Sequence, residues 1–161
     1  MDTGLSTGET LPVEEALARA RALVPTLRAR QAATERARRV SAETIADLKR
    51  AQLFRILQPR RYGGYEYSLA DFVRLGAAVA SGCGSTGWVY SVATQHNWQI
   101  GMFAPELQDE VWSDDPTVIS GSSYSPAGTA VPSDGGYRLS GSWMFSSGCE
   151  AVDWMILGAR F

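Results

Sequence analysis

The chain has 161 residues, of which 45% are hydrophobic and 20% are charged, a composition typical of a folded globular domain. Its formal net charge of −2 argues against a dedicated nucleic-acid-binding protein. Most of the Lys and Arg residues lie between Arg19 and Arg61, where we expect a solvated helical face rather than a phosphate-binding patch. No apolar run approaches the about 20 residues that a membrane-spanning helix needs, and the N-terminus lacks the basic and apolar regions of a secretory signal. We therefore expect a cytoplasmic protein that binds neither nucleic acid nor membranes.

The first helix is predicted to follow a polar segment, residues 1–11, which we expect to be flexible. Pro12 suits the start of a helix, because proline lacks the backbone N–H that would be unpaired there. Apolar residues at helical spacing then define one buried stripe: Val13, Leu17, Ala20, Val24 and Leu27. Pro25 interrupts this stripe and predicts a kink or a break.

Further helices are indicated by capping residues and by apolar periodicity. Ser41 is predicted to cap a second helix that ends near Phe54. Ser68 and Asp71 form a capping-box pattern at the start of a third helix. Pro105 is predicted to begin a short amphipathic helix. We therefore expect an all-helical domain over residues 12–115.

After Pro116 the pattern changes to short β-like runs separated by Gly, Ser and Pro. The runs cover residues 118–119, 137–139, 143–145 and 152–161. Asp134-Gly135-Gly136 between two of these runs predicts a hairpin. The last run reaches Phe161 without a turn or a partner strand, so we expect a truncated sheet. The predicted fold class is α+β, with the helical domain followed by the first strands of an antiparallel β-barrel or sandwich over residues 116–161.

Few residues offer chemistry. Cys83 and Cys149 show no metal-ligand spacing, and we expect both to be reduced core residues. With one histidine, His96, the chain supports neither a metal site nor a Ser-His-Asp triad. Imidazole titrates near neutral pH and can hydrogen-bond a phenol, although a structural, hydrogen-bonded histidine is the alternative.

Two serine-rich segments, residues 120–124 and 145–148, stand at the predicted ends of strands. Backbone amides and small hydroxyl side chains in such places could bind the polar edge of a flavin ring. The alternative is that both segments are ordinary β-turns.

Several segments in their order along the chain resemble the acyl-CoA dehydrogenase superfamily. They are Leu57-Gln58-Pro59, Tyr62-Gly63-Gly64 and Cys83-Gly84-Ser85-Thr86-Gly87-Trp88. Three more are similar to one branch of it, the oxygenase components of two-component flavin-dependent monooxygenases: residues 122–126, 134–137 and 140–149. That branch includes p-hydroxyphenylacetate hydroxylases and the secosteroid phenol hydroxylase of bacterial steroid breakdown.

This resemblance implies roles for particular residues. Trp88 would pack near the flavin ring, and His96 would contact the substrate phenol oxygen and help its deprotonation. Ser122 would hydrogen-bond the substrate or the flavin, and Ser147 would lie near flavin N5 and the C4a peroxide. The other expected cofactor-binding residues are Trp143, Phe145 and Ser146. Catalysis would thus depend on His96 and Ser147.

The resemblance also implies a mechanism. Reduced FMN or FAD would come from a separate NAD(P)H-dependent flavin reductase and react with O2 to give a C4a-hydroperoxide. A small aromatic substrate, a phenol, would then be hydroxylated ortho to its oxygen. The family further implies a homotetramer, and a secosteroid-type phenol is the first expectation for the substrate, with indoles and sulfur or nitrogen oxidation left open.

Two departures from the family pattern keep alternatives open. Many similar proteins have Asp-His where this chain has Glu150-Ala151, and they add a C-terminal helical bundle. One alternative is an acyl-CoA dehydrogenase proper, although its usual Trp-Ile-Thr flavin motif is replaced by residues 143–146. The other is a non-catalytic module that retains the scaffold.

Overall fold

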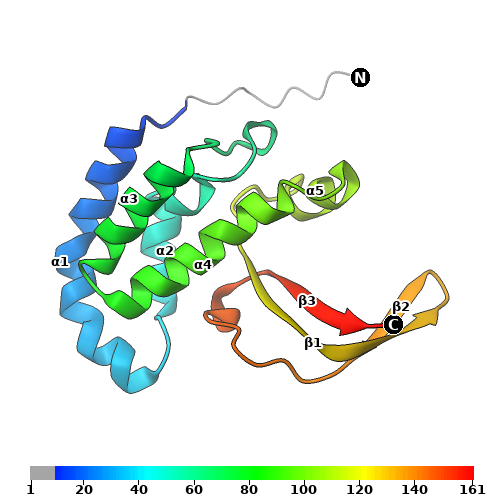
Figure 1. The fold of residues 1–161 in the computed structure, drawn as a ribbon. Coiled ribbons are helices and arrows are strands. Elements are labelled where there is room, and N and C mark those ends of the chain that lie inside the picture. The colour runs from blue at the N-terminus through cyan, green and yellow to red at the C-terminus, as the bar shows by residue number, and fades with distance from the viewer. Residues whose placement is uncertain (1–9) are drawn as a thin grey trace.

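The computed structural model describes residues 10–161, in which a group of helices precedes a small sheet (Figure 1). The helices are α1 (Val13–Ala37), α2 (Ala42–Arg50), α3 (Leu69–Ala80), α4 (Gly84–Ile100) and α5 (Pro105–Trp112). The strands are β1 (Ser120–Ser133), β2 (Gly136–Ser140) and β3 (Trp154–Arg160). The predicted α+β class, with helices first, is confirmed. Residues 1–9 of the N-terminal segment that we expected to be flexible lie outside the described residues.

Helix α1 continues through Pro25, so the break that the sequence allowed does not occur. The apolar stripe is buried on both sides of the proline, with Leu17 and Leu27 each 1% exposed. Packing of this stripe, largely against α3, stabilises the helix where proline removes a backbone hydrogen bond. The core also extends ahead of the helix, because Leu11 is buried within it.

Helix α2 begins as predicted, with the Ser41 hydroxyl accepting a hydrogen bond from the backbone N–H of Thr44 at 3.2 Å. It ends at Arg50, however, and the prediction that it reaches Phe54 is wrong. Gln52 adopts the left-handed conformation, with φ of 63°, which the α-helix cannot continue through. Phe54 is still buried, but from a separate 3-10 turn, Leu53–Arg55.

Helices α3 and α4 pack closely and place α4 beside the sheet. Ser68 caps α3 as predicted, accepting from the backbone N–H of Asp71 at 3.1 Å. A Cβ atom on Gly87 of α4 would lie 2.5 Å from the Cβ of Ala80 in α3, so only glycine permits this approach. Nearby Cys83 is a free, buried core residue as predicted, whereas free Cys149 is exposed because it lies in a short surface turn, Cys149–Ala151.

The described strands form a sheet in the order β2-β1-β3. β1 and β2 form the predicted antiparallel hairpin around Asp134 and Gly135, where glycine takes φ of 77°. β3 is parallel to β1, so the prediction of antiparallel pairing throughout is wrong. The reason is that the chain runs back along the sheet after β2, and β3 enters beside Ser120 at the start of β1.

Residues 143–145 do not form the predicted strand. The Trp143 ring instead covers the sheet, where a Cβ atom on Gly128 would lie 2.1 Å from it. Its indole N–H donates to the Gly158 carbonyl at 2.7 Å. The sequence pattern predicted that this segment would be a strand of the sheet. Instead, its Trp143 side chain covers the sheet.

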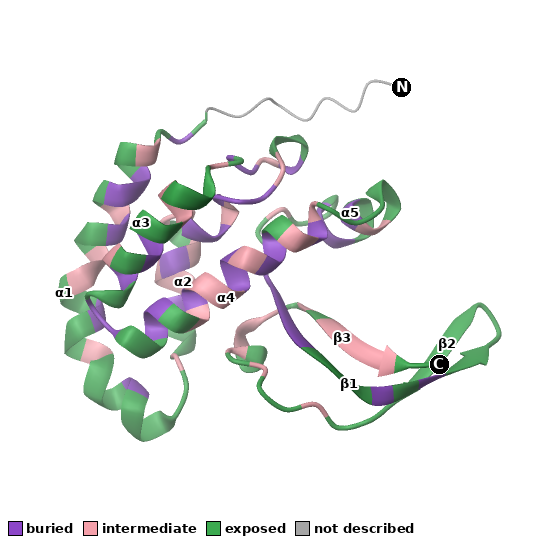
Figure 2. Cartoon of the chain, viewed as in Figure 1, coloured by how far each residue is buried: buried purple, intermediate pink, exposed green. Residues whose placement is uncertain are grey.

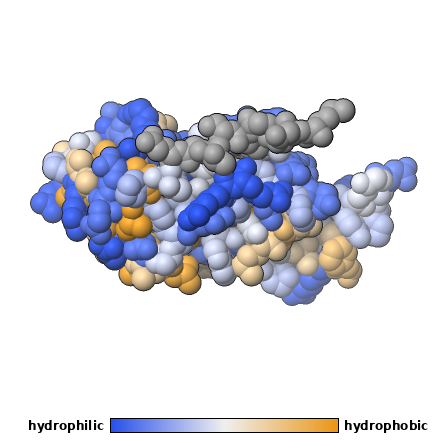
Figure 3. Space-filling view, turned by 90° about the horizontal axis from the view of Figure 1, so that it is seen from above, coloured by the Kyte–Doolittle hydropathy of each residue, from blue (hydrophilic) through white to orange (hydrophobic). Residues whose placement is uncertain are grey.

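Burial is uneven across the molecule (Figure 2). The main core lies among α1, α2, α3 and α4, whereas every residue of β2 is exposed. In Figure 3, hydrophobic side chains reach the surface in separate patches among hydrophilic ones. Within residues 10–161, we find no helix with the length and apolar character needed to cross a membrane.

Candidate functional site

Helix α4 carries two of the predicted site residues in different surroundings. Trp88 lies in the first turns of the helix and is 63% exposed, whereas His96 is 1% exposed. His96 follows Trp88 by eight positions, which corresponds to about 12 Å along the helix axis. One helix thus presents an indole at the surface and an imidazole in the interior.

His96 is held by the start of β1. Its Nδ1 lies 3.1 Å from the carbonyl oxygen of Ser120. Because a carbonyl can only accept, Nδ1 carries the proton and donates, which leaves Nε2 as the acceptor of the neutral ring. Burial lowers the pKa of His96 from its ordinary value of 6.5, against a smaller raising effect of the Ser120 hydrogen bond. The imidazole is therefore neutral around pH 7.

Ser122 lies on the face of β1 that is turned toward α4. Side chains of a strand alternate between faces, so Ser122 shares its face with Tyr124. The Tyr124 ring meets the His96 ring edge-on, with centroids 5.9 Å apart, and its hydroxyl hydrogen-bonds Gln99 of α4. Ser122 is buried and belongs to this seam between α4 and β1, which we call the His96 seam and define by His96, Ser120, Ser122 and Tyr124.

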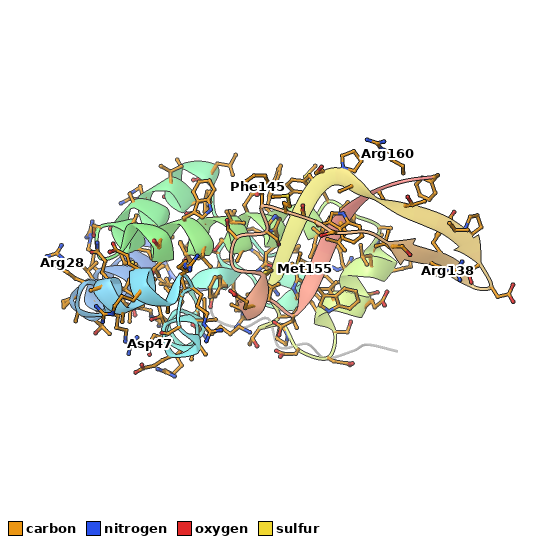
Figure 4. The ribbon with its side chains drawn as sticks, turned by 90° about the horizontal axis from the view of Figure 1, so that it is seen from below. Arg28, Asp47, Arg138, Phe145, Met155 and Arg160 are labelled. Carbon is orange, nitrogen blue, oxygen red and sulfur yellow. The ribbon has the colours of Figure 1, made fainter. Side chains whose placement is uncertain are left out.

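Phe145, Ser146, Ser147 and Gly148 form a turn that crosses from the sheet back to α4, and we call it the 145–148 turn. Phe145 has φ of 60°, an unusual value for a residue other than glycine, and its side chain is 93% exposed. Figure 4 labels this side chain at the junction of the helices and the sheet. The Ser146 hydroxyl lies 3.9 Å from the sulfur of Met155 in β3.

Ser147 contacts Trp88 directly. The Trp88 indole N–H donates to the Ser147 hydroxyl oxygen at 2.9 Å. Both residues line a cleft of about 650 Å³, together with Gly148, the first residues of α4 and the turn between α1 and α2. The charged residues Arg38, Arg39, Glu35 and Glu150 also line this cleft. The cleft has the size of a small-molecule site.

The structure therefore brings the predicted residues together in two places. Trp88 and Ser147 meet at the cleft, whereas His96 and the buried Ser122 belong to the His96 seam, where the imidazole contacts Ser120 and Tyr124. His96 is not among the residues that line the cleft. Trp143 was expected to contact a cofactor. Its ring packs against Gly128, and its indole N–H donates to the Gly158 carbonyl.

Two residues within the serine-rich segment 120–124 shape these places through contacts that were not predicted from the sequence. Tyr124 was identifiable, because it stands two positions after Ser122 in a strand and must share its face. Ser123, on the opposite face, donates its hydroxyl hydrogen to the Met144 carbonyl at 2.7 Å and ties the segment before the 145–148 turn to β1. No local pattern marks that contact, since its partners are 21 positions apart.

Comparison with known proteins finds similarity to one family and to several flavin-dependent enzymes. The family model described as acyl-CoA dehydrogenase, N-terminal domain, matches residues 5–120. The chain is 42% identical over 137 residues to HsaA, the oxygenase subunit of a flavin-dependent monooxygenase from Rhodococcus jostii (strain RHA1), covering 85% of this chain and 36% of that protein. It is 42% identical over 126 residues to the oxygenase component of an FADH2-dependent resorcinol hydroxylase from Rhizobium sp. (strain MTP-10005), covering 78% of this chain and 31% of that protein.

Among solved structures, the chain is similar to XiaF from Streptomyces sp. in complex with FADH2 and glycerol. The TM-score is 0.88 at 32% sequence identity, and the match covers 92% of this chain and 37% of XiaF. The chain spans about a third of the length of the curated relatives it matches.

Proposed function

Because the chain belongs to the acyl-CoA dehydrogenase family, by its match to that family's N-terminal domain, we propose that the protein is the oxygenase component of a two-component flavin-dependent monooxygenase. The family resemblance predicted from the sequence is thereby confirmed. We propose further that a phenol is hydroxylated ortho to its oxygen with O2 and reduced FMN or FAD, which a separate reductase supplies. The names of the resorcinol hydroxylase and of HsaA support this reaction class, and the FADH2 bound to XiaF supports the reduced flavin.

The observation that carries the proposal is the state of His96. Its Nδ1 donates to the Ser120 carbonyl, and burial lowers its pKa, so a neutral ring with a free Nε2 lone pair persists at neutral pH. Such a nitrogen can accept the proton of a phenol, and a phenolate is more nucleophilic at its ortho carbon than a phenol is. A protonated histidine has no free lone pair and could not accept this proton.

Ser122 and Tyr124 complete the substrate side of this proposal. Both lie on the face of β1 that is turned toward α4. Ser122 would hydrogen-bond the substrate oxygen beside His96, or the edge of the flavin. The Tyr124 ring would wall the aromatic substrate and limit the access of water to the imidazole.

The 145–148 turn and Trp88 suit a flat ligand. The turn presents the hydroxyls of Ser146 and Ser147 together with an exposed Phe145 ring, and the Trp88 indole is open beside them. A flavin ring is planar and has polar atoms along one edge, which hydroxyls and backbone groups can bind. When bound, the reduced flavin supplies the oxygen chemistry, and these residues orient its ring.

The proposal is tested by supplying the protein with NADH, a flavin reductase, FAD or FMN, and a panel of phenols under ¹⁸O2. The expected product is a catechol that carries ¹⁸O, formed only when both the protein and the reductase are present. Consumption of NADH with release of hydrogen peroxide alone, for every phenol in the panel, would contradict the proposal. Oxidation of an acyl-CoA in the same assay would favour the dehydrogenase alternative.

A further inference from the structure

The 145–148 turn rests on α4 at two successive helix residues. Ser147 receives the Trp88 indole hydrogen bond at 2.9 Å, between residues 59 positions apart in the chain. Gly148, with φ of 81°, lies so close to the next helix residue that a Cβ atom there would be 2.7 Å from the Val89 Cγ1. The turn therefore lies directly against α4 at both of these helix residues.

The hydrogen-bonding capacities of the two groups give the bond a direction. An indole N–H can only donate, whereas a serine hydroxyl has one donor and two lone pairs. Ser147 must therefore accept from Trp88, and its own O–H remains available to donate elsewhere. Ser147 lines the cleft, so an acceptor bound there is within the reach of this O–H.

The exposure of Trp88 is informative. The side chain is 63% exposed, so it contributes little of its large apolar area to the core. Its polar atom is nevertheless engaged with a serine that is distant in sequence. Tryptophan has only two side-chain torsions and loses little entropy when it holds a partner in place.

We propose that Trp88 is a positioning residue for Ser147: its indole N–H orients the Ser147 hydroxyl so that the hydroxyl donates to the polar edge of a reduced flavin. The identity of that acceptor rests on the proposed function. The indole–serine bond does not, because it joins two side chains of the chain itself.

The bond is measured first without flavin, in the chain labelled with ¹⁵N at its five tryptophan indoles. Trp88→Phe assigns the Trp88 resonance. In Ser147→Ala that resonance moves upfield, and its N–H exchanges with solvent about twofold to tenfold faster, the effect of losing one ordinary hydrogen bond. Ser147→Thr, which keeps the hydroxyl, restores it, and the matched control Ser146→Ala leaves it in place. An unmoved Trp88 resonance in Ser147→Ala overturns the inference.

The flavin is measured next, by anaerobic titration with reduced FMN and reduced FAD. Trp88→Phe keeps an aromatic ring and removes the N–H, and Ser147→Ala removes the hydroxyl. Each weakens binding by about twofold to tenfold, and the double variant weakens it by less than the product of the two separate factors, because both changes break one arrangement. Multiplicative losses show that the residues act independently and overturn the inference.

Failure of the proposed function gives a different result. The wild-type protein would then bind reduced flavin with the coupled dependence on Trp88 and Ser147, yet yield no hydroxylated phenol. That result supports the positioning role while it removes the phenol reaction. The converse result is also distinguishable. If the wild-type protein gives ¹⁸O-labelled product, but Trp88→Phe changes neither the environment of Ser147 nor flavin binding, only the positioning role is overturned.

Discussion

The imidazole of His96, which belongs to α4, and the hydroxyl of Ser147, which contacts α4, are held in place in different ways. His96 is 1% exposed and is fixed by the Ser120 carbonyl and the Tyr124 ring. Ser147 is exposed, in a turn with no regular secondary structure, and it is fixed by Trp88. One group is buried in the His96 seam, and the other is attached to the surface of α4.

This difference assigns different physical tasks to the two places. Burial sets a charge state, because water can no longer stabilise the imidazolium, and it lowers the pKa of His96. A surface turn cannot set a charge state in this way, but it can open to admit a ligand and close on it. The seam is therefore suited to proton transfer and the 145–148 turn to binding.

The largest expected effect is that of His96→Asn on hydroxylation. Asparagine can still donate to the Ser120 carbonyl, but it cannot accept a proton, so product formation falls by about 10²- to 10⁴-fold. Peroxide release per NADH consumed rises, because the flavin still reacts with oxygen. Product analysis together with a peroxide assay measures both. Unchanged coupling in this variant would return His96 to a structural role.

A second prediction concerns the packing that holds the seam in place. Gly87→Val puts a side chain against Ala80, where a Cβ atom already lies 2.6 Å from the backbone Cα, and we expect a loss of about 3 kcal/mol of unfolding free energy. Gly84→Val is the matched control, since a Cβ atom there has no neighbour within 4 Å. Urea denaturation of both variants measures the difference. Equal losses would mean that α3 and α4 do not pack as described.

A third prediction applies the same comparison of glycine substitutions to the 145–148 turn, where we expect a smaller effect. Gly148 and Gly135 have similar positive φ values, 81° and 77°, so alanine at either position costs about 1 kcal/mol in backbone strain. Only Gly148 meets a side chain, that of Val89. Gly148→Ala should therefore lower the unfolding free energy more than Gly135→Ala does. Equal effects in thermal denaturation would indicate a turn that does not rest on α4.

The sequence predicted the features of the fold that depend on neighbouring residues. Ser41 and Ser68 cap helices because their partners are three positions away, and Asp134-Gly135 forms a hairpin because glycine permits the required backbone angle. The parallel pairing of β1 and β3 was not predictable in this way, since it depends on the path of the chain between residues 141 and 153. Trp143 looked like a strand residue but packs against Gly128, which is distant in sequence.

The candidate site shows the same contrast between what neighbouring residues predict and what only the fold determines. The residues were identifiable from the family resemblance, but not their partners. That His96 donates to the Ser120 carbonyl, and that Trp88 donates to Ser147, follows only from the fold, because each bond joins separate elements. Burial of His96, which decides its charge, likewise depends on how β1 covers α4.

The smallest expected effect is on the pH dependence of stability. In the unfolded chain His96 has its ordinary pKa of 6.5, and in the folded chain its pKa is lower. The unfolded state thus binds more protons between these two values, so the unfolding free energy falls as the pH drops from about 6.5 towards the folded pKa. His96→Asn should flatten this part of the curve. A slope that persists in the variant would assign it to other groups.

Transfer of a phenol proton to Nε2 of His96 can be observed with 4-nitrophenol, whose anion absorbs visible light. The phenol is titrated with acid while bound to the wild-type protein and to His96→Asn. We predict that the bound phenol ionises at a lower pH in the wild-type protein than in the variant, because the neutral imidazole accepts its proton. Ionisation at the same pH in both proteins would contradict the role of His96 as the proton acceptor.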